Sequence, residues 1–198
     1  MSAAKGITLY THKMCPFAQK AWIALNLAGS PFDLQEVQLH GGKPDWFLKM
    51  NPKGLVPVLK HGERVIIESE VILDYIASGD FPTSRELAPE GEEERWWRQT
   101  VDLRLRPLGK SAVQMGQFSG DLKALLLEME QRLQTSGPYL AGEDVSLADA
   151  STFPFLYRLD HEYKLGESDF PALKGWLQRM SQMDEVARTV MQSWWWWW

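Results

Sequence analysis

The chain has 198 residues, a formal net charge of −5, one cysteine and ten tryptophans. A lone cysteine excludes an internal disulfide and a zinc site built on cysteines, and the excess of acidic over basic side chains (26 against 21) argues against a nucleic-acid surface. No apolar run approaches the ~20 residues that a membrane helix needs, and residues 1–6 lack the layout of a signal peptide, so we expect a cytoplasmic protein without membrane partners.

Strand and helix signals alternate over the first 80 residues. Four short β-prone runs predict strands, at residues 6–10, 32–39, 55–59 and 65–67. Residues 15–28 repeat apolar side chains at helical spacing, and Gly29 follows them at a position that commonly ends a helix. Residues 70–77 are again helical. The order βαβ and then ββα predicts a thioredoxin-like α/β domain in which the first two strands are parallel.

The second half of the chain has helical signals throughout. We expect a first domain over residues 1–78, a turn-rich linker over 79–88 and an all-α domain over 89–198. The predicted helices begin near residues 89, 121, 146, 171 and 184, and the last one extends to residue 192. Pro107 predicts a kink in the first of them, and Ser146 with Asp149 matches a capping box.

Cys15 is the first candidate for chemistry, because it stands between the first strand and the first helix, directly before Pro16. This placement predicts that its sulfur lies at the helix N-terminus, where unpaired N–H groups and the helix dipole favour a thiolate. The alternative is a small buried hydrophobic residue, which the position before proline makes the weaker interpretation. A second cysteine three residues on is missing, since that residue is Ala18. An external thiol must therefore resolve any disulfide of Cys15, and glutathione is the abundant cytosolic candidate.

Two further stretches could bind a peptide-like ligand. Val56-Pro57 lies at the start of the third strand, where a cis proline would turn the backbone of Val56 outward for pairing with an extended ligand. The alternative is an ordinary proline of an edge strand. Glu68-Ser69 follows the fourth strand, with Ser69 as the candidate N-cap of the next helix. These two could hold the ammonium and the carboxylate of a γ-glutamyl group, whereas the alternative is a plain cap beside a solvated glutamate.

These motifs together resemble the cysteine-type glutathione transferases. The matching segments are Cys15-Pro16-Phe17-Ala18, Lys43-Pro44-Asp45-Trp46-Phe47, the run from Asn51 to Leu59, and Glu68-Ser69. The pattern is most similar to the omega class and also resembles the plant lambda class. The resemblance is dense over residues 7–77, and the second half agrees with it mainly in its helical character.

The resemblance implies a thioredoxin-like domain, followed by an all-α domain that lines a second-substrate pocket. It implies glutathione as co-substrate, a homodimer and no metal, and it assigns Cys15 to the glutathione sulfur. The glutathione-binding set that it implies is Phe17, Lys43, Val56, Pro57, Glu68 and Ser69. In this set Lys43 would bind the glycyl carboxylate, Val56 would pair with the cysteinyl backbone, and Glu68 with Ser69 would bind the γ-glutamyl end.

The implied activity is that of a thiol transferase, in which Cys15 takes up a glutathionyl group and a second glutathione releases it. Small mixed disulfides, dehydroascorbate and S-conjugated ketones all remain candidate substrates. One alternative is a transferase that conjugates glutathione to electrophiles, with Tyr10 or Thr11 as the hydroxyl that holds the glutathione thiolate. Another is a binding protein without catalysis, as in the chloride intracellular channel proteins and the bacterial stringent-starvation regulators.

The ten tryptophans divide into two groups of five. One group lies on predicted helices and is expected to pack there, at Trp22, Trp46, Trp96, Trp97 and Trp176. The other group is the run Trp194–Trp198. We interpret this run as a loose terminal tail, and the alternative is a cap over the second-substrate pocket.

Overall fold

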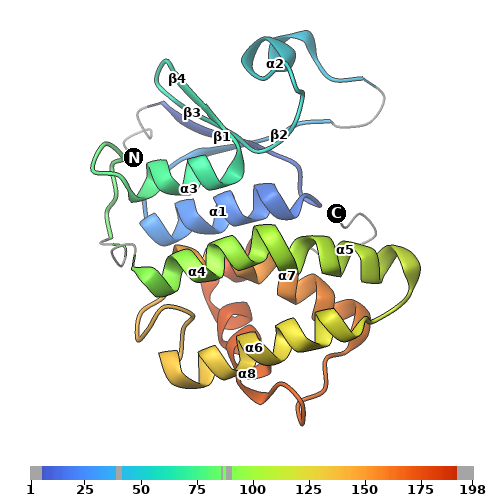
Figure 1. The fold of residues 1–198 in the computed structure, drawn as a ribbon. Helices are drawn as coiled ribbons and strands as arrows, with labels where there is room; N and C mark the ends of the chain where they lie inside the picture. The colour runs from blue at the N-terminus through green and yellow to red at the C-terminus, as the bar shows by residue number, and fades with distance from the viewer. Residues whose placement is uncertain (1–5, 39–41, 86, 88–90, 191–198) are drawn as a thin grey trace. The chain divides into compact units, whose positions relative to one another are not determined.

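The structure is a computed structural model that describes residues 6–38, 42–85, 87 and 91–190 (Figure 1). The chain forms two compact units, which divide between Glu86 and Leu87. Within the predicted linker, residues 79–85 belong to the first unit. There Phe81 is 4% exposed and packs against Tyr75, and the hydroxyl of Ser84 donates to the carbonyl of Gly29.

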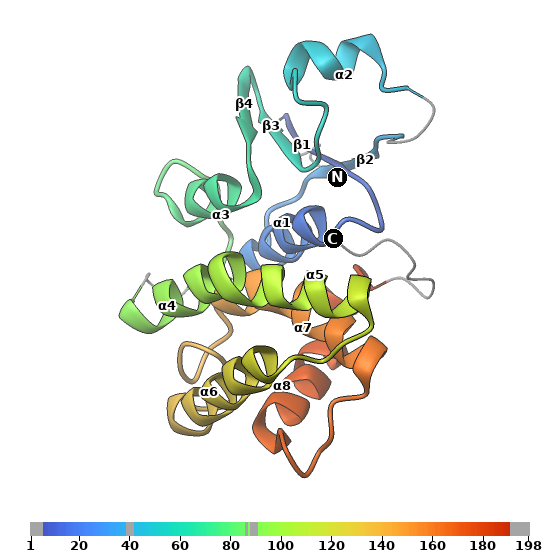
Figure 2. The same ribbon diagram turned by 45° about the vertical axis from the view of Figure 1, so that its right-hand side comes forward.

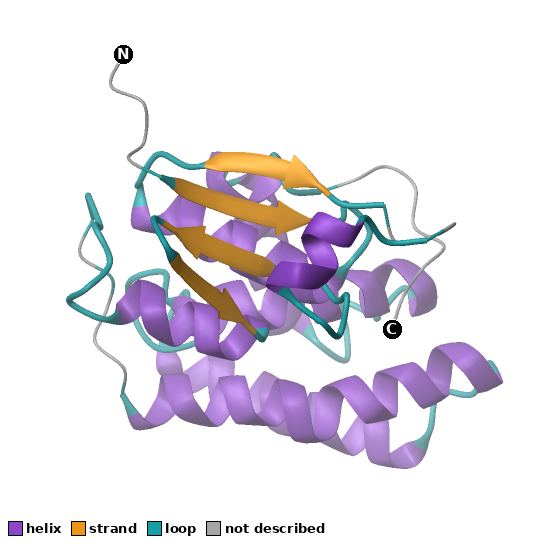
Figure 3. Ribbon diagram, turned by 90° about the horizontal axis from the view of Figure 1, so that it is seen from above, coloured by secondary structure: helices purple, strands orange, loops and turns teal. Residues whose placement is uncertain are grey.

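The first unit contains a four-stranded mixed sheet (Figure 3). Its strands are β1 (Ile7–Thr11), β2 (Asp33–Glu36), β3 (Val58–His61) and β4 (Arg64–Ile67), in the spatial order β2-β1-β3-β4. β1 and β2 are parallel, whereas β1 with β3 and β3 with β4 are antiparallel. The third strand begins at Val58, three residues later than predicted, and it continues to His61 because this segment pairs with Ile7–Tyr10 of β1.

Three helices flank this sheet. They are α1 (Pro16–Ala28), α2 (Asp45–Met50) and α3 (Ser69–Ala77). α1 and α3 lie side by side on one face of the sheet, and α2 lies on the other face (Figures 1 and 3). The alternating burial of β1, with Ile7 and Leu9 fully inside, provides the apolar surface on which the helices pack. The βαβ-ββα order of the prediction is confirmed, with α2 as an addition between the two parts.

The described part of the second unit is helical, which confirms the predicted all-α domain. Its elements are α4 (Glu92–Thr100), the π-helical turn η1 (Val101–Leu105), α5 (Arg106–Met115), α6 (Gly120–Ser136), α7 (Leu147–Tyr163), α8 (Pro171–Gln182) and α9 (Asp184–Ala187). α7 packs against α4 and α8, and α6 packs against α8 (Figure 2). The turn η1 lies just before Pro107, whose ring nitrogen has no hydrogen to give to a carbonyl of the preceding turn.

Two helix starts of the second unit agree with the sequence, and one helix end does not. Ser146 and Asp149 form the predicted capping box, and Pro171 is the first residue of α8. The helix predicted over residues 184–192 is wrong in length, because α9 ends at Ala187. Beyond it, the N–H groups of Thr189 and Val190 donate to carbonyls three residues back, so the chain tightens into turns.

The tryptophans of the predicted helices differ in burial. Trp97 and Trp176 are completely buried in the second unit, as expected. Trp46 is 42% exposed, and it packs against neighbouring aromatic rings rather than inside a core. The centre of its ring lies 5.6 Å from that of Tyr10 and 5.7 Å from that of Phe47. The run Trp194–Trp198 lies outside the described residues.

Candidate active site

Cys15 is the N-cap residue of α1. Its backbone is extended (φ −83°, ψ 116°), Pro16 is the first helical residue, and the first turn contains no acidic side chain. The N–H of Cys15 donates to the carbonyl of His12 at 3.0 Å, and its own carbonyl accepts from Gln19 at 2.9 Å. The side chain is therefore held at the N-terminus of a 13-residue helix, with no first-turn carboxylate to oppose a negative charge.

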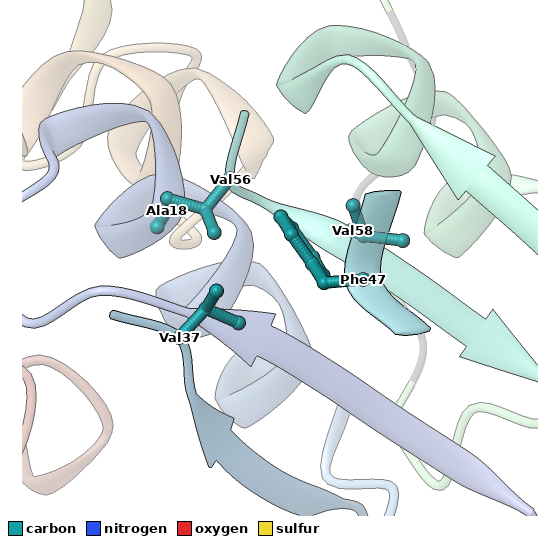
Figure 4. Close-up of a cluster of buried hydrophobic side chains, with 5 residues drawn as sticks. All are labelled: Ala18, Val37, Phe47, Val56 and Val58. Atoms are coloured by element: carbon teal, nitrogen blue, oxygen red, sulfur yellow. The ribbon is translucent and has the colours of Figure 1, made fainter. Parts of the chain in front are cut away.

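The thiol of Cys15 is half-buried and faces the chain just before β3. Its Sγ lies 3.9 Å from the carbonyl oxygen of Val56. The side chain packs against a buried cluster that consists of Ala18, Val37, Phe47, Val56 and Val58 (Figure 4). This cluster joins α1, α2 and the sheet, so the packing of the first unit fixes the distance between Cys15 and Val56.

Val56 has its side chain inside and part of its backbone available. The side chain is 8% exposed, and the Val56–Pro57 peptide bond is cis, one of the two alternatives that the sequence left open. Within the described residues, no hydrogen bond involves the N–H of Val56. An extended ligand could therefore accept from this N–H while lying beside the Cys15 sulfur.

Asn51 holds the loop that leads to Val56, and the sequence analysis did not assign it a role. Its side chain is almost fully buried, with the residue 2% exposed. Its amide nitrogen donates to the carbonyl of Leu55 at 2.8 Å, and its amide oxygen accepts from the N–H of Lys53 at 3.2 Å. The signal for this role was the Asn-Pro-x-Gly pattern, in which Gly54 adopts a positive φ of 60°.

Lys43 extends across this loop. A Cβ atom added to Gly54 would meet Cδ and Nζ of Lys43 at 2.5 and 3.1 Å, so the lysine side chain lies directly over the glycine. Among the described residues, the Lys43 ammonium makes no ion pair. Its side chain therefore lies over Gly54, two positions before Val56 in the chain, as a cation that is available to a carboxylate.

The predicted N-cap at Ser69 is wrong by one residue. Glu68 is the N-cap of α3 and Ser69 is its first helical residue, 9% exposed. The shift arises because the chain turns at Glu68, which has a φ of 69° that residues other than glycine rarely adopt. The side chain of Glu68 does not cap α3. Its Oε1 instead lies 2.7 Å from Nζ of Lys53, a partner that sequence spacing alone did not indicate.

Phe17 is half-buried in the first turn of α1. Nζ of Lys20 lies 5.8 Å from the centre of its ring. Lys20 itself has no exposed side-chain surface and pairs with Glu70, which lies in the first turn of α3. This ion pair links the N-terminal turns of α1 and α3, and it too was missed because its members are 50 residues apart in the chain.

Thr11 is buried, and Tyr10 is partly buried with its ring packed against α2. Thr11 is 1% exposed, and its hydroxyl has no hydrogen-bond partner in the described chain. The Tyr10 ring packs against the rings of Trp46 and Phe47. Of Tyr10, Thr11 and Cys15, the side chain of Cys15 is therefore the best placed for contact with a ligand sulfur.

Among the described residues, no group of three or more histidine, cysteine or acidic side chains could hold a metal ion. No helix in this part of the chain has the length and apolar character needed to cross a membrane.

Two family models match the chain. They describe the N-terminal domain of glutathione S-transferases, over residues 14–78, and their C-terminal domain, over residues 111–179. The first match contains all the predicted site residues, from Cys15 to Ser69.

Curated proteins with similar sequences carry related names. The chain is 30% identical to glutathione S-transferase L1 of Arabidopsis thaliana, over 91% of this chain and 80% of that protein. It is 28% identical to glutathione S-transferase omega-1 of Mus musculus, over 91% of this chain and 78% of that protein. It is also 29% identical to the probable chloroplastic glutathione S-transferase DHAR2 of Oryza sativa subsp. japonica. That match spans 89% of this chain and 65% of the relative.

Solved structures confirm the predicted fold class. Glutathione transferase Omega 3C from Trametes versicolor superposes with a TM-score of 0.82, at 24% identity over 94% of this chain and 90% of that one. Leishmania TDR1, described as a unique trimeric glutathione transferase, gives a TM-score of 0.80 at 25% identity. The match covers 95% of this chain and 46% of the Leishmania chain.

Proposed function

Because the chain belongs to the glutathione S-transferase family, we propose that it is a glutathione-dependent thiol transferase in which Cys15 forms a mixed disulfide with glutathione. The observation that carries the proposal is the position of Cys15. It is the N-cap of α1, and its sulfur faces the carbonyl of Val56 at 3.9 Å. A thiolate is favoured there, and a peptide backbone paired with Val56 would bring its own sulfur close.

The proposed binding mode follows the loop from Lys43 to Ser69. The glycyl carboxylate of glutathione binds the Lys43 ammonium, and the cysteinyl backbone pairs with Val56, whose outward backbone depends on Pro57. The γ-glutamyl ammonium binds Glu68. The γ-glutamyl carboxylate accepts from Ser69 at the N-terminus of α3.

Phe17 forms the apolar wall next to Cys15 in this proposal. Its half-buried ring stands two residues into α1, where an aromatic face excludes water from the reacting sulfur atoms. The protein therefore contributes a favoured thiolate and a fixed orientation of the tripeptide.

The proposed reaction has two exchange steps. The Cys15 thiolate attacks the glutathionyl sulfur of a disulfide R–S–SG, so a new S–S bond forms while R–S⁻ leaves and takes up a proton. The thiolate of a second glutathione then attacks the glutathionyl sulfur on Cys15. Glutathione disulfide leaves and the Cys15 thiolate returns. The net change is R–S–SG + GSH → R–SH + GSSG, so one glutathione thiol is oxidised and the other half of the glutathione disulfide comes from the substrate.

The test compares the native chain with a Cys15→Ser variant in glutathione-dependent reduction of a small mixed disulfide. We expect the variant to lose at least ~100-fold in rate, because the nucleophile is missing. Mass spectrometry of the native chain after the first step should show one added glutathionyl group, on Cys15. The variant should still bind S-methylglutathione, which shows that the loss is chemical. Full disulfide reduction by the variant would overturn the proposal.

The two alternatives are less well supported. A conjugating transferase needs a hydroxyl beside the glutathione sulfur, and the hydroxyl of Thr11 is buried while the ring of Tyr10 packs against α2. A binding protein without catalysis has no use for a thiolate at the start of a helix. The relatives named as transferases also favour a catalytic function. Assays with a model electrophile and with S-methylglutathione separate these outcomes from thiol transfer.

Dehydroascorbate is a second substrate worth testing, because two of the similar rice proteins carry the designation DHAR. We also propose a cytoplasmic location and a homodimer. Those two rice relatives are named cytosolic and chloroplastic, so location is to be determined by imaging of the tagged protein in its own cell.

A further inference from the structure

The ion pair between Lys53 and Glu68 is the feature of the site that the proposed function leaves unused. Nζ of Lys53 lies 2.7 Å from Oε1 of Glu68, with side chains that are 61% and 56% exposed. Glu68 could have capped its own helix, but its carboxylate reaches instead to a residue 15 positions earlier. The pair therefore lies at the surface where the γ-glutamyl group is proposed to bind.

Lys53 is held in this position by its backbone. Its N–H donates to the buried side chain of Asn51 at 3.2 Å, and the next residue, Gly54, donates to the carbonyl of Asn51 at 2.8 Å. The same turn supports Lys43 on one side and leads to Val56 on the other. Lys53 is therefore a fixed part of the loop that surrounds the ligand, unlike a lysine on a free surface helix.

The charges around this loop match those of the tripeptide. Lys43, Lys53 and Glu68 provide two positive charges and one negative charge. Glutathione provides two carboxylates and one ammonium at neutral pH. One carboxylate and the ammonium are attached to the same carbon of the γ-glutamyl group, so this end is a zwitterion. A paired lysine and glutamate complement such a zwitterion, because each charge finds an opposite partner.

We infer that Lys53 is a second cation of the glutathione site, which exchanges its partner when the ligand binds. In the free protein it neutralises Glu68. When glutathione binds, the ligand ammonium takes over Glu68 and the adjacent carboxylate takes over Lys53, so the number of ion pairs does not fall. The site thereby selects γ-glutamyl groups that retain both charges. This inference rests on the proposed function and extends it to the ligand end that is farthest from the reacting sulfur.

The test uses two ligands that cannot form disulfides, S-methylglutathione and the S-methyl derivative of 4-aminobutyryl-Cys-Gly. The second ligand retains the ammonium and lacks the γ-glutamyl carboxylate. Binding of each to the native chain and to Lys53→Met is measured by calorimetry at low ionic strength. Lys49→Met is the matched control, because Lys49 is an exposed lysine of α2 and belongs to no ion pair among the described residues.

We expect Lys53→Met to weaken S-methylglutathione binding about fivefold, the size typical of a partly exposed ion pair. The carboxylate-free ligand should bind this variant as well as it binds the native chain, or more tightly, since Glu68 is then unoccupied. Lys49→Met should change neither affinity.

Two results would overturn the inference while leaving the proposed function intact. The first is equal binding of S-methylglutathione to the native chain and to Lys53→Met, which would show that Lys53 does not contribute to binding. The second is tighter binding by the variant, which would make Lys53 a competitor of the ligand ammonium. If the native chain itself fails to bind S-methylglutathione, the proposed function is wrong as well.

Discussion

Gly54 shows how a residue without a side chain can position one that carries charge. It adopts a left-handed φ of 60°, and the side chain of Lys43 occupies the space where its Cβ would be. An added side chain would therefore conflict with the left-handed backbone, with Lys43 and, at 3.1 Å, with Cδ2 of Leu48. Of these conflicts, the one with Lys43 bears on the proposed ligand binding.

Gly54→Ala is expected to weaken S-methylglutathione binding severalfold, because the added methyl displaces Lys43 from the loop. It should also lower the free energy of unfolding by about 1 kcal/mol, the cost of a left-handed alanine. Gly62→Ala is the control, since Gly62 has a φ of 59° and nothing lies within 4 Å of its added Cβ. That variant should lose similar stability and keep its affinity, as measured by denaturant titration and calorimetry. Equal affinities in the two variants would show that Lys43 does not depend on Gly54.

At the scale of the elements, Asp149 connects three parts of the second unit. Its Oδ2 accepts from the N–H and hydroxyl of Ser146 at the start of α7. Its Oδ1 accepts from Nε1 of Trp176 on α8 at 2.7 Å and from the N–H of Leu140 at 3.1 Å.

Asp149→Ala would leave four buried donors without this acceptor. We expect the free energy of unfolding to fall by about 3 kcal/mol, against little change for the exposed control Asp144→Ala.

Burial raises the pKa of the Asp149 carboxyl above its ordinary value, and the hydrogen bonds from Trp176, Ser146 and Leu140 act in the opposite direction. Because the pKa in the folded chain exceeds that in the unfolded chain, protonation of this group favours folding. Its contribution to stability is complete below the unfolded value and decreases as pH rises through the folded value. The difference in unfolding free energy between the native chain and Asp149→Ala should therefore shrink as pH rises above about 4, the ordinary pKa of an aspartate. A difference that grows over this range would contradict the raised pKa.

The elements also show where sequence patterns suffice. β1 and α1 were predictable because their apolar residues recur with the periods of a strand and a helix, and Pro171 marks the start of α8 by its fixed φ. The first residue of α3 was not predictable from the sequence, because it depends on the backbone conformation of Glu68. The end of α9 depends on local turn hydrogen bonds that no periodicity records.

For the molecule as a whole, the resemblance to glutathione transferases is confirmed, and it was strong because its motifs keep their order along the chain. The positions of Cys15 and Val56 were predictable in the same way. The ion pairs Lys53–Glu68 and Lys20–Glu70 were not predictable, because the sequence does not show which lysine lies near which glutamate in the folded chain. The sequence therefore indicated the chemical groups of the candidate site, and the structure added the partners of two of its side chains, Glu68 and Cys15.

The assembly of the molecule is testable directly. We expect a homodimer, so light scattering after gel filtration should give twice the mass of the chain at micromolar concentration. A trimer would contradict this expectation, and Leishmania TDR1 is described as a trimeric member of this family. The Cys15→Ser variant serves as the control, because its mass should be the same if the assembly needs no disulfide between chains.

The left-handed backbone of Glu68 also matters to anyone who wishes to improve this protein. A non-glycine residue in such a conformation costs on the order of 1–3 kcal/mol, which glycine would largely avoid. A library selected for heat resistance alone would therefore enrich glycine at position 68 and discard the carboxylate that faces Lys53. Selection rounds would need to alternate thermal challenge with ligand capture, because at this position the two objectives favour different amino acids.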